Sequence, residues 1–230
     1  MASSRAAVRP IAARSVVAQV TDELRRAIVS GALTPGEEYS LRELAGMLEV
    51  SFIPVREALR SLESEGLVHN RPGRSARIVP LDLDDLHGIY RLRRTLEPAI
   101  ARRSCALLAD EALDALEAEA AGFADERQSM DDIYEDHHGF HLALLAPAVS
   151  AWDTRVLTSL WHAAERYIRI GFGRLDPDPA EHHRRGQAHL DLVAAFRSRD
   201  PDTAAAAVEQ HLARNERLAL SALSAYSENP

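Results

Sequence analysis

Four histidines in the second half of the chain have the residue type and the spacing that a metal site requires. His137 and His141 are four positions apart, so on a helix both rings would lie on one face. His189 opens an apolar helical face, and His211 follows 22 residues later. Imidazole nitrogens bind divalent ions, and facing helices of a bundle can bring such rings together around one ion. The pattern therefore predicts a metal site.

Three further histidines lie close to these positions in the sequence. We expect His138, His182 and His183 at the surface or around the metal site rather than among its ligands. His183 is the strongest rival, because it comes only six residues before His189. For any single histidine on an apolar helix face, the ordinary interpretation is a hydrogen-bonded core residue, and that alternative stays open.

The elements that would carry these histidines are helices. Apolar residues recur with helical periodicity along the chain after residue 80. Proline-containing breaks interrupt this pattern, for example at Pro147 and Pro201. The predicted helices cover residues 83–107, 110–128, 131–146, 150–171, 179–198 and 201–222. Their short connections predict a mainly α fold, an antiparallel bundle of six to seven helices.

The first 80 residues have a different pattern, which predicts three shorter helices. These helices cover residues 15–30, 40–48 and 52–65. Ser40 and Glu43 have the spacing of a capping box, which predicts the start of the second helix. Ser51 is the predicted N-cap of the third.

A predicted hairpin after these helices completes the outline of a winged helix-turn-helix. A tight turn separates the second and third helices, and the third presents Arg56 and Arg60 on its exposed side. Two brief strands are predicted over residues 67–70 and 76–79, joined by a basic tip that contains Gly73. Such a unit binds the major groove of double-stranded DNA.

Length and composition favour two domains in a reducing compartment. We predict a boundary near residue 80, with a DNA-binding domain over residues 1–80 and an effector-binding and dimerisation domain over residues 81–230. Cys105 is the only cysteine, so no disulfide can form within the chain. No run of about 18 uncharged apolar residues could span a membrane. We therefore expect a cytoplasmic protein without a membrane partner.

The net charge of −8 conceals an asymmetry between the two parts. Residues 1–80 contain 11 arginines and 9 acidic residues, whereas residues 81–230 contain 16 arginines and 26 acidic residues. The acidic total therefore does not exclude a basic DNA-binding face, although an ordinary solvated surface would have the same charges.

Several short pieces of the first 80 residues, in fixed order, resemble the winged helix-turn-helix of the GntR family. They are Gly31, Pro35-Gly36, the segment LRELAGMLEVS, Pro54 to Leu59, Glu65 to Val68 and the Arg-Pro-Gly-Arg tip. The remainder is similar to the helical FCD ligand domain of the FadR branch, through the segments RRTLE and HHGFHLALL. The resemblance covers nearly the whole chain. It implies a transcription regulator that is not an enzyme, and by family habit a repressor.

The resemblance also implies which residues touch operator DNA. The expected contacts are Arg42, Ser51, Phe52, Arg56, Gly73 and Arg74. Arg42 and Arg56 could each bind a guanine or a phosphate through two hydrogen bonds. The chain departs from the family at Phe52, where an arginine is common. Phe52 would either pack on a thymine methyl group, together with Ile53, or serve as a core residue at the helix start.

For the bundle, the resemblance implies a metal site built from Asp-x-x-x-His and two later histidines. The histidines of that pattern correspond to His141, His189 and His211, whereas His137 stands in the place of the aspartate. An imidazole in place of a carboxylate shifts the preference of the site from hard ions such as Mn²⁺ towards Zn²⁺ or Ni²⁺. It also leaves the positive charge of the ion uncompensated, which would attract an anionic effector.

Arg93 matches the family arginine that points into the effector cavity, where it could pair with a small carboxylate metabolite. The alternative is an ordinary surface salt bridge with Glu97. We expect a homodimer, since one helix-turn-helix reads only half of an operator, and we expect its DNA affinity to respond to the metabolite. Two alternatives stay open. The ion itself could be the signal, or the bundle could be a metalloenzyme, although the chain lacks a helical HExxH motif.

Overall fold

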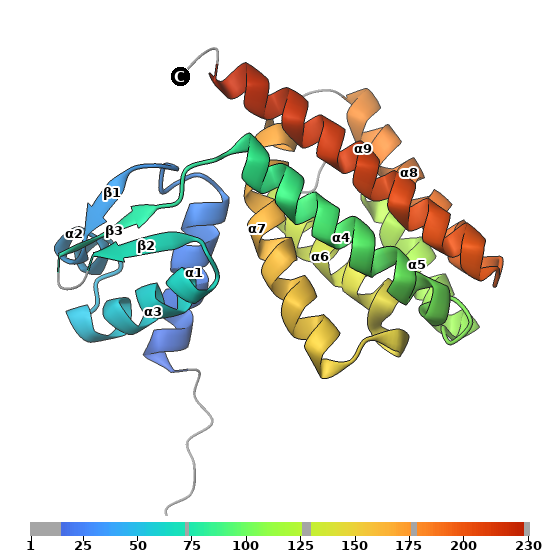
Figure 1. Ribbon diagram of the computed structural model, residues 1–230, viewed down its shortest axis with the longest axis horizontal. Helices are drawn as coiled ribbons and strands as arrows, with labels where there is room; N and C mark the ends of the chain where they lie inside the picture. The colour runs from blue at the N-terminus through green and yellow to red at the C-terminus, as the bar shows by residue number, and fades with distance from the viewer. Residues whose placement is uncertain (1–14, 72–73, 126–129, 176–178, 228–230) are drawn as a thin grey trace, which may run out of the picture.

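The computed structural model of the protein describes residues 15–71, 74–125, 130–175 and 179–227, and these residues are mainly α-helical (Figure 1). Two separate hydrophobic cores organise them. The first is built from side chains between Val20 and Ile78, and the second from side chains between Leu86 and Leu223. This arrangement confirms the predicted fold class, a winged helix-turn-helix followed by a bundle of helices.

The N-terminal unit combines helices with a small antiparallel sheet. Its described elements are α1 (Val16–Val29), β1 (Glu38–Ser40), α2 (Leu41–Met47), α3 (Phe52–Ser64), β2 (Val68–Arg71) and β3 (Ser75–Ile78). The strand order is β1-β3-β2, so β3 is central. The core of the unit forms where α1 packs against α3, through side chains such as Leu24, Ile28 and Leu59.

Local hydrogen bonds explain where these helices begin. The predicted capping box of α2 is present, because Ser40 Oγ accepts from the amide of Glu43 and Glu43 Oε2 accepts from the amide of Ser40, at 3.2 and 2.7 Å. Ser51 is the N-cap of α3, as predicted, but its hydroxyl accepts no capping hydrogen bond from the described backbone. Ser51 is an exposed residue.

Strand β1 was not predicted from the sequence. Three residues are too few to show the alternation of a strand, and β1 exists because it pairs with β3, with Tyr39 opposite Ala76. Gly36, with a φ of +84°, turns the chain into this strand, and its amide donates to the carbonyl oxygen of Ile78 at 3.0 Å. The Ser75 hydroxyl also donates to the Glu38 carboxylate across the same pair of strands.

The C-terminal bundle contains each of the predicted helices, but the helix predicted over residues 110–128 ends at Gly122, and residues 126–128 lie outside the described ranges. Its described elements are α4 (Leu83–Ser104), α5 (Asp110–Gly122), α6 (Met130–Leu145), the short 3₁₀ helix η1 (Ala146–Ala148), α7 (Ala151–Leu175), α8 (Pro179–Arg197) and α9 (Pro201–Ser227). Helices α4 and α9 run side by side, and α5 packs against α8 (Figure 1). Of the helices in the described ranges, none is both long and apolar enough to cross a membrane.

Helix α7 of the bundle contacts both the N-terminal unit and the segment that joins the two units. Nη1 of Arg166 donates to the carbonyl oxygen of Val79 at 3.1 Å. The hydroxyl of Tyr167 donates to Asp85 at 2.8 Å and accepts from the amide of Asp82 at 3.3 Å. Helix α1 also packs against α7. The segment that joins the two units is therefore held by side chains of α7.

Candidate metal centre

The four predicted histidines meet inside the bundle. His137 and His141 come from α6, His189 from α8 and His211 from α9. Each offers one ring nitrogen, and these four atoms all lie within 4.8 Å of one another. The Nε2 atoms of His137 and His141 are 3.3 Å apart. Nitrogens around one tetrahedral Zn²⁺ ion are about 3.4 Å apart, so the cluster is close to the spacing that an ion would require.

Hydrogen bonds outside the cluster orient two of the rings. Nδ1 of His189 donates to the carbonyl oxygen of Arg185 at 2.7 Å, which leaves the lone pair on Nε2. Nε2 of His211 lies 3.0 Å from the side-chain amide of Asn215, whose oxygen, with the amide turned over, would accept from Nε2–H and leave the lone pair on Nδ1. Nε2 of His189 and Nδ1 of His211 are buried without a hydrogen-bond partner among the described residues. Buried polar atoms rarely stay unpaired, so these residues fit a bound ion.

Burial keeps the four rings neutral. It lowers the pKa of His137, His141 and His211 well below the ordinary value, and the charges of neighbouring rings lower it further. Burial also lowers the pKa of His189 to about 4. Only a neutral imidazole has a lone pair available for a metal, so the environment favours the ligand form of each ring.

Aromatic side chains pack against the cluster. The ring centroids of Phe123 and Phe140 lie 4.8 and 5.2 Å from that of His189. Gly186 on α8 makes this packing possible, because a Cβ atom at that position would lie 2.8 Å from the Cβ of Ala124. A side chain at Gly186 would push α8, and with it His189, away from the end of α5.

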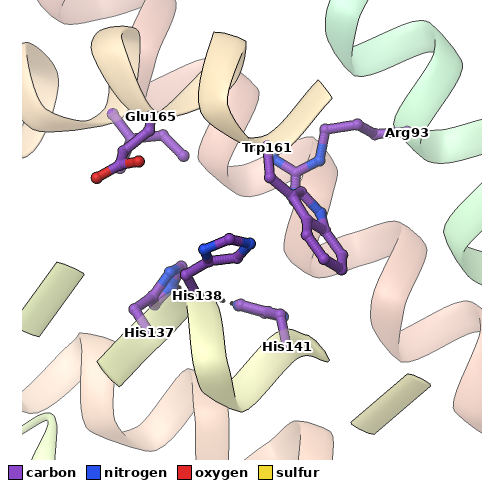
Figure 2. Close-up of a pocket in the computed structure, with 7 residues that line it drawn as sticks. Arg93, His137, His138, His141, Trp161 and Glu165 are labelled. Atoms are coloured by element: carbon purple, nitrogen blue, oxygen red, sulfur yellow. Dashed lines mark hydrogen bonds between the residues drawn. The ribbon is translucent and has the colours of Figure 1, made fainter. Parts of the chain in front are cut away.

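A small cavity of about 30 Å³ lies beside the cluster (Figure 2). Its walls are Arg93, His137, His138, His141, Trp161, Glu165 and Ile168. Figure 2 shows Arg93 and Trp161 across the cavity from Glu165. The arginine expected to bind an effector and two of the clustered histidines therefore border the same space.

Arg93 is buried, with only 4% of its side chain exposed. Its Nε donates to Oε1 of Glu97 at 2.7 Å, and the same oxygen accepts the indole N–H of Trp161 at 2.9 Å. The alternative of an ordinary surface salt bridge is therefore wrong about the environment, because α7 covers the pair with Trp161. Arg93 both pairs with Glu97 and lines the cavity.

The other three histidines stay outside the cluster, as expected. His138 is half-buried and lines the cavity. His182 is buried, and its Nδ1 lies 3.1 Å from Nη2 of Arg185. Arg185 is also the residue whose carbonyl oxygen orients His189. His183, the expected rival ligand, is exposed.

The residues expected to contact DNA are exposed wherever the structure describes them. They are Arg42, Ser51, Phe52, Arg56 and Arg74, whereas Gly73 lies outside the described residues. Phe52 has 51% of its surface exposed and Ile53 has 70%. The alternative in which Phe52 is a core residue is therefore wrong. The buried positions at the start of α3 belong to Pro54 and Val55.

Comparison with known proteins assigns both parts of the chain. Residues 16–78 match the family described as bacterial regulatory proteins, gntR family, and residues 88–214 match the FCD domain. The chain belongs to the GntR family. It is a transcriptional regulator whose helical bundle is an FCD ligand-binding domain.

Relatives of this GntR-family chain include two named repressors. HTH-type transcriptional repressor RspR of Escherichia coli (strain K12) is 31% identical over 198 residues, which cover 84% of each chain. HTH-type transcriptional repressor NanR of Cronobacter sakazakii (strain ATCC BAA-894) is 28% identical and covers 89% of this chain and 85% of that protein. The solved structure of E. coli McbR/YncC has a TM-score of 0.79 at 22% identity, covers 91% of this chain and 99% of that one, and shares the fold.

Three residues that line the cavity in this GntR-family bundle were not predicted from the sequence. Trp161, Glu165 and Ile168 all come from α7. They are four and three residues apart, so they share one face of the helix. That spacing was visible in the sequence, but it does not show that the face borders the histidines of α6.

Proposed function

We propose that this GntR-family chain is a repressor whose affinity for operator DNA is controlled by a small carboxylate metabolite, bound next to a histidine-held divalent ion. The observation that carries this proposal is the position of Arg93, which lines the same cavity as His137 and His141. A guanidinium beside a metal centre favours an anion. The repressor would act on DNA in the cytoplasm, as a homodimer divided near residue 80 into reading and sensing domains.

Zn²⁺ or Ni²⁺ is the ion that the four histidines support best. Neutral imidazoles suit these ions, whereas Mn²⁺ and Mg²⁺ prefer carboxylate and carbonyl oxygens. When bound, the ion would supply a fixed positive charge beside Arg93, with no carboxylate among these four ligands to offset it. His189 and His211 are already oriented by Arg185 and Asn215, so these two rings would lose little conformational entropy when an ion binds.

The DNA-reading role rests on the exposed residues of α2 and α3. The N-terminus of α3 would enter the major groove, where Arg42 and Arg56 can bind guanine or phosphate. Phe52 and Ile53 expose apolar side chains at the start of the same helix, and these suit thymine methyl groups. We propose Ser51 and the tip around Gly73 and Arg74 as further contacts to the DNA backbone.

A second candidate function is a metal-responsive repressor in which the ion alone is the signal. The size of the cavity favours it, because about 30 Å³ is room for only one or two water molecules. A carboxylate metabolite would have to displace a wall, whereas an ion would bind between rings that already face one another.

Operator binding under three conditions separates these candidates. DNA selected from a random library by the protein itself would be titrated with metal-free protein, with protein plus Zn²⁺ or Ni²⁺, and with the same protein plus a panel of small carboxylates. The metabolite proposal predicts that affinity changes only when a carboxylate joins the ion. The metal-sensor proposal predicts the change with the ion alone.

Two histidine variants provide the matched comparison. His211→Ala removes one proposed ligand and should abolish the response. His183→Ala removes an exposed histidine and should preserve it. Operator affinity that ignores every ion and every carboxylate would contradict both candidates.

A further inference from the structure

Two cavities in the molecule share a wall. The cavity of about 30 Å³ beside the histidine cluster and a hollow of about 200 Å³ between α1 and α7 are both lined by His138 and Glu165. On its other side the hollow is lined by Arg25 and Arg26 of α1. His138 and Glu165 therefore separate the proposed ligand cavity from the space between the bundle and the N-terminal unit.

The ligand cavity can accept a carboxylate metabolite only if one of its walls moves, because its volume is that of one or two water molecules. Arg93 and Trp161 are held in place, since both donate to the buried carboxylate of Glu97. Nε2 of His138, in contrast, has no hydrogen-bond partner in the described part of the chain. Glu165 accepts from Arg169 of its own helix at 2.9 Å, a pair that can move as a unit because both side chains border the hollow. The hollow behind His138 and Glu165 gives them space to move into.

A series of contacts leads from this wall to the N-terminal unit. The rings of His138 and His162 have their centroids 5.6 Å apart. Nδ1 of His162 lies 3.7 Å from Oε2 of Glu65. The Glu65 carboxylate accepts two hydrogen bonds from Arg25, at 2.9 and 2.8 Å.

The last two residues of this series, Glu65 and Arg25, belong to two different helices of the N-terminal unit. Glu65 is the C-cap of α3, the helix proposed to read DNA, and Arg25 lies on α1. Their side chains are only 19% and 21% exposed, so the ion pair is partly shielded from water. The bidentate pair joins the end of α3 to α1, and His162 adds a contact from α7.

We propose that His138 and Glu165 form a movable wall, and that a ligand entering the cavity pushes this wall towards α1 and shifts the contact between His162 and the Glu65–Arg25 pair. The inference rests on the proposed function and specifies how it would be regulated. A ligand that fits only beside the displaced wall binds that state preferentially. Ligand binding would therefore increase the fraction of molecules in which the wall is displaced and the position of α3 has shifted.

Hydrogen–deuterium exchange of the full chain tests this relay without knowledge of the natural ligand or the operator. The probe is Zn²⁺ with acetate, compared with metal-free protein. In the wild type we expect slower exchange in α6, α8 and α9, and an exchange change of about threefold or more in α1 and the last turn of α3. His162→Ala and Glu65→Gln should keep the first change and lose the second.

The matched control is Glu57→Gln. Glu57 also pairs with an arginine, Arg60 of α3, but the two side chains are 47% and 64% exposed and neither lines the hollow. This variant should behave as the wild type does. If the change in α1 persists undiminished in His162→Ala and Glu65→Gln, the relay is overturned, while the ligand site itself stands.

A ligand-free arm keeps the relay testable if the metal site fails. Absence of any exchange change in α6, α8 and α9 of the wild type would contradict the proposed metal site. Ile168→Phe adds volume to the cavity wall directly, whereas Ile168→Met keeps about the same volume and serves as the matched control. In metal-free protein Ile168→Phe should change exchange in α1, Ile168→Met should not, and His162→Ala should suppress the change. No change in α1 with a folded Ile168→Phe variant would overturn the relay on its own.

Discussion

Nε of Arg93 lies 2.7 Å from Oε1 of Glu97, and the two side chains are only 4% and 2% exposed. The charge of each residue is therefore compensated mainly by the other, in an environment where water cannot do so. Because Arg93 also lines the ligand cavity, the stability of the bundle and the chemistry of the proposed ligand site depend on the same ion pair.

Glu97→Met and Arg93→Met should each destabilise the bundle strongly. Removing one partner of a buried pair leaves the other charge uncompensated, which costs about 3–5 kcal/mol. The double variant Arg93→Met with Glu97→Met should recover much of this loss, because no buried charge remains. Urea unfolding of the four proteins measures the effect. Losses that simply add in the double variant would contradict the interpretation.

His137→Asp should move the metal preference of the cluster towards Mn²⁺. The substitution replaces a neutral imidazole with a negatively charged oxygen ligand, which hard ions prefer. The measurement is the ratio of Zn²⁺ to Mn²⁺ affinity, obtained by competition with a chelator. His183→Asp introduces the same charge at an exposed position and should leave the ratio unchanged.

Glu65 should make the stability of the N-terminal unit depend on pH in the acidic range. Although burial raises its pKa, two hydrogen bonds from Arg25 and the contact with His162 at 3.7 Å lower it to about 2, from an ordinary value of 4.5. The unfolded state therefore binds more protons between these values, so the stabilisation is complete above pH 4.5 and disappears as the pH falls towards 2.

Glu65→Gln isolates this contribution. Unfolding experiments at pH 7, 4 and 2.5 should show the largest difference between wild type and variant at pH 7, and a much smaller one at pH 2.5. Glu57→Gln, which disrupts an exposed pair with Arg60, provides the comparison. A wild-type minus variant difference that is independent of pH would rule out the ion pair as its source.

Phe52→Ala should weaken binding to operators that carry thymine opposite the start of α3, by about 1–3 kcal/mol. The phenyl ring is half-exposed and offers apolar surface but no hydrogen bond to a base. Competition between selected operators and versions with cytosine in place of thymine measures the effect. Equal losses on both DNA sequences would mean that Phe52 does not read the methyl group. Ser64→Ala, at the exposed far end of the same helix, serves as a control.

The sequence was sufficient to predict most of the fold because the helices carry their own signals. Periodic apolar residues and the Ser40–Glu43 capping box are local features, and the structure reproduces both. Strand β1 escaped prediction because it depends on pairing with a strand about 37 residues away, as between Tyr39 and Ala76. A three-residue strand has no local pattern of its own.

The candidate site was likewise predictable only in part. The four-residue spacing of His137 and His141 already places both rings on one helix face, whereas the meeting of His189 and His211 with them depends on how α6, α8 and α9 pack. The bond between Trp161 and Glu97 joins residues 64 positions apart, and no local pattern indicates it. Tertiary packing determines such contacts, and a single sequence does not contain that information in readable form.

The position of Trp161 gives the protein an optical reporter. The chain has only two tryptophans, and Trp152 is 69% exposed, far more than Trp161 at 6%. A Trp152→Phe variant would therefore emit from the cavity wall alone. Because the indole N–H of Trp161 is bound to the carboxylate that also holds Arg93, any molecule that displaces this arrangement would change the wavelength and intensity of the emission. Candidate effectors could then be screened by fluorescence, without a label and without DNA.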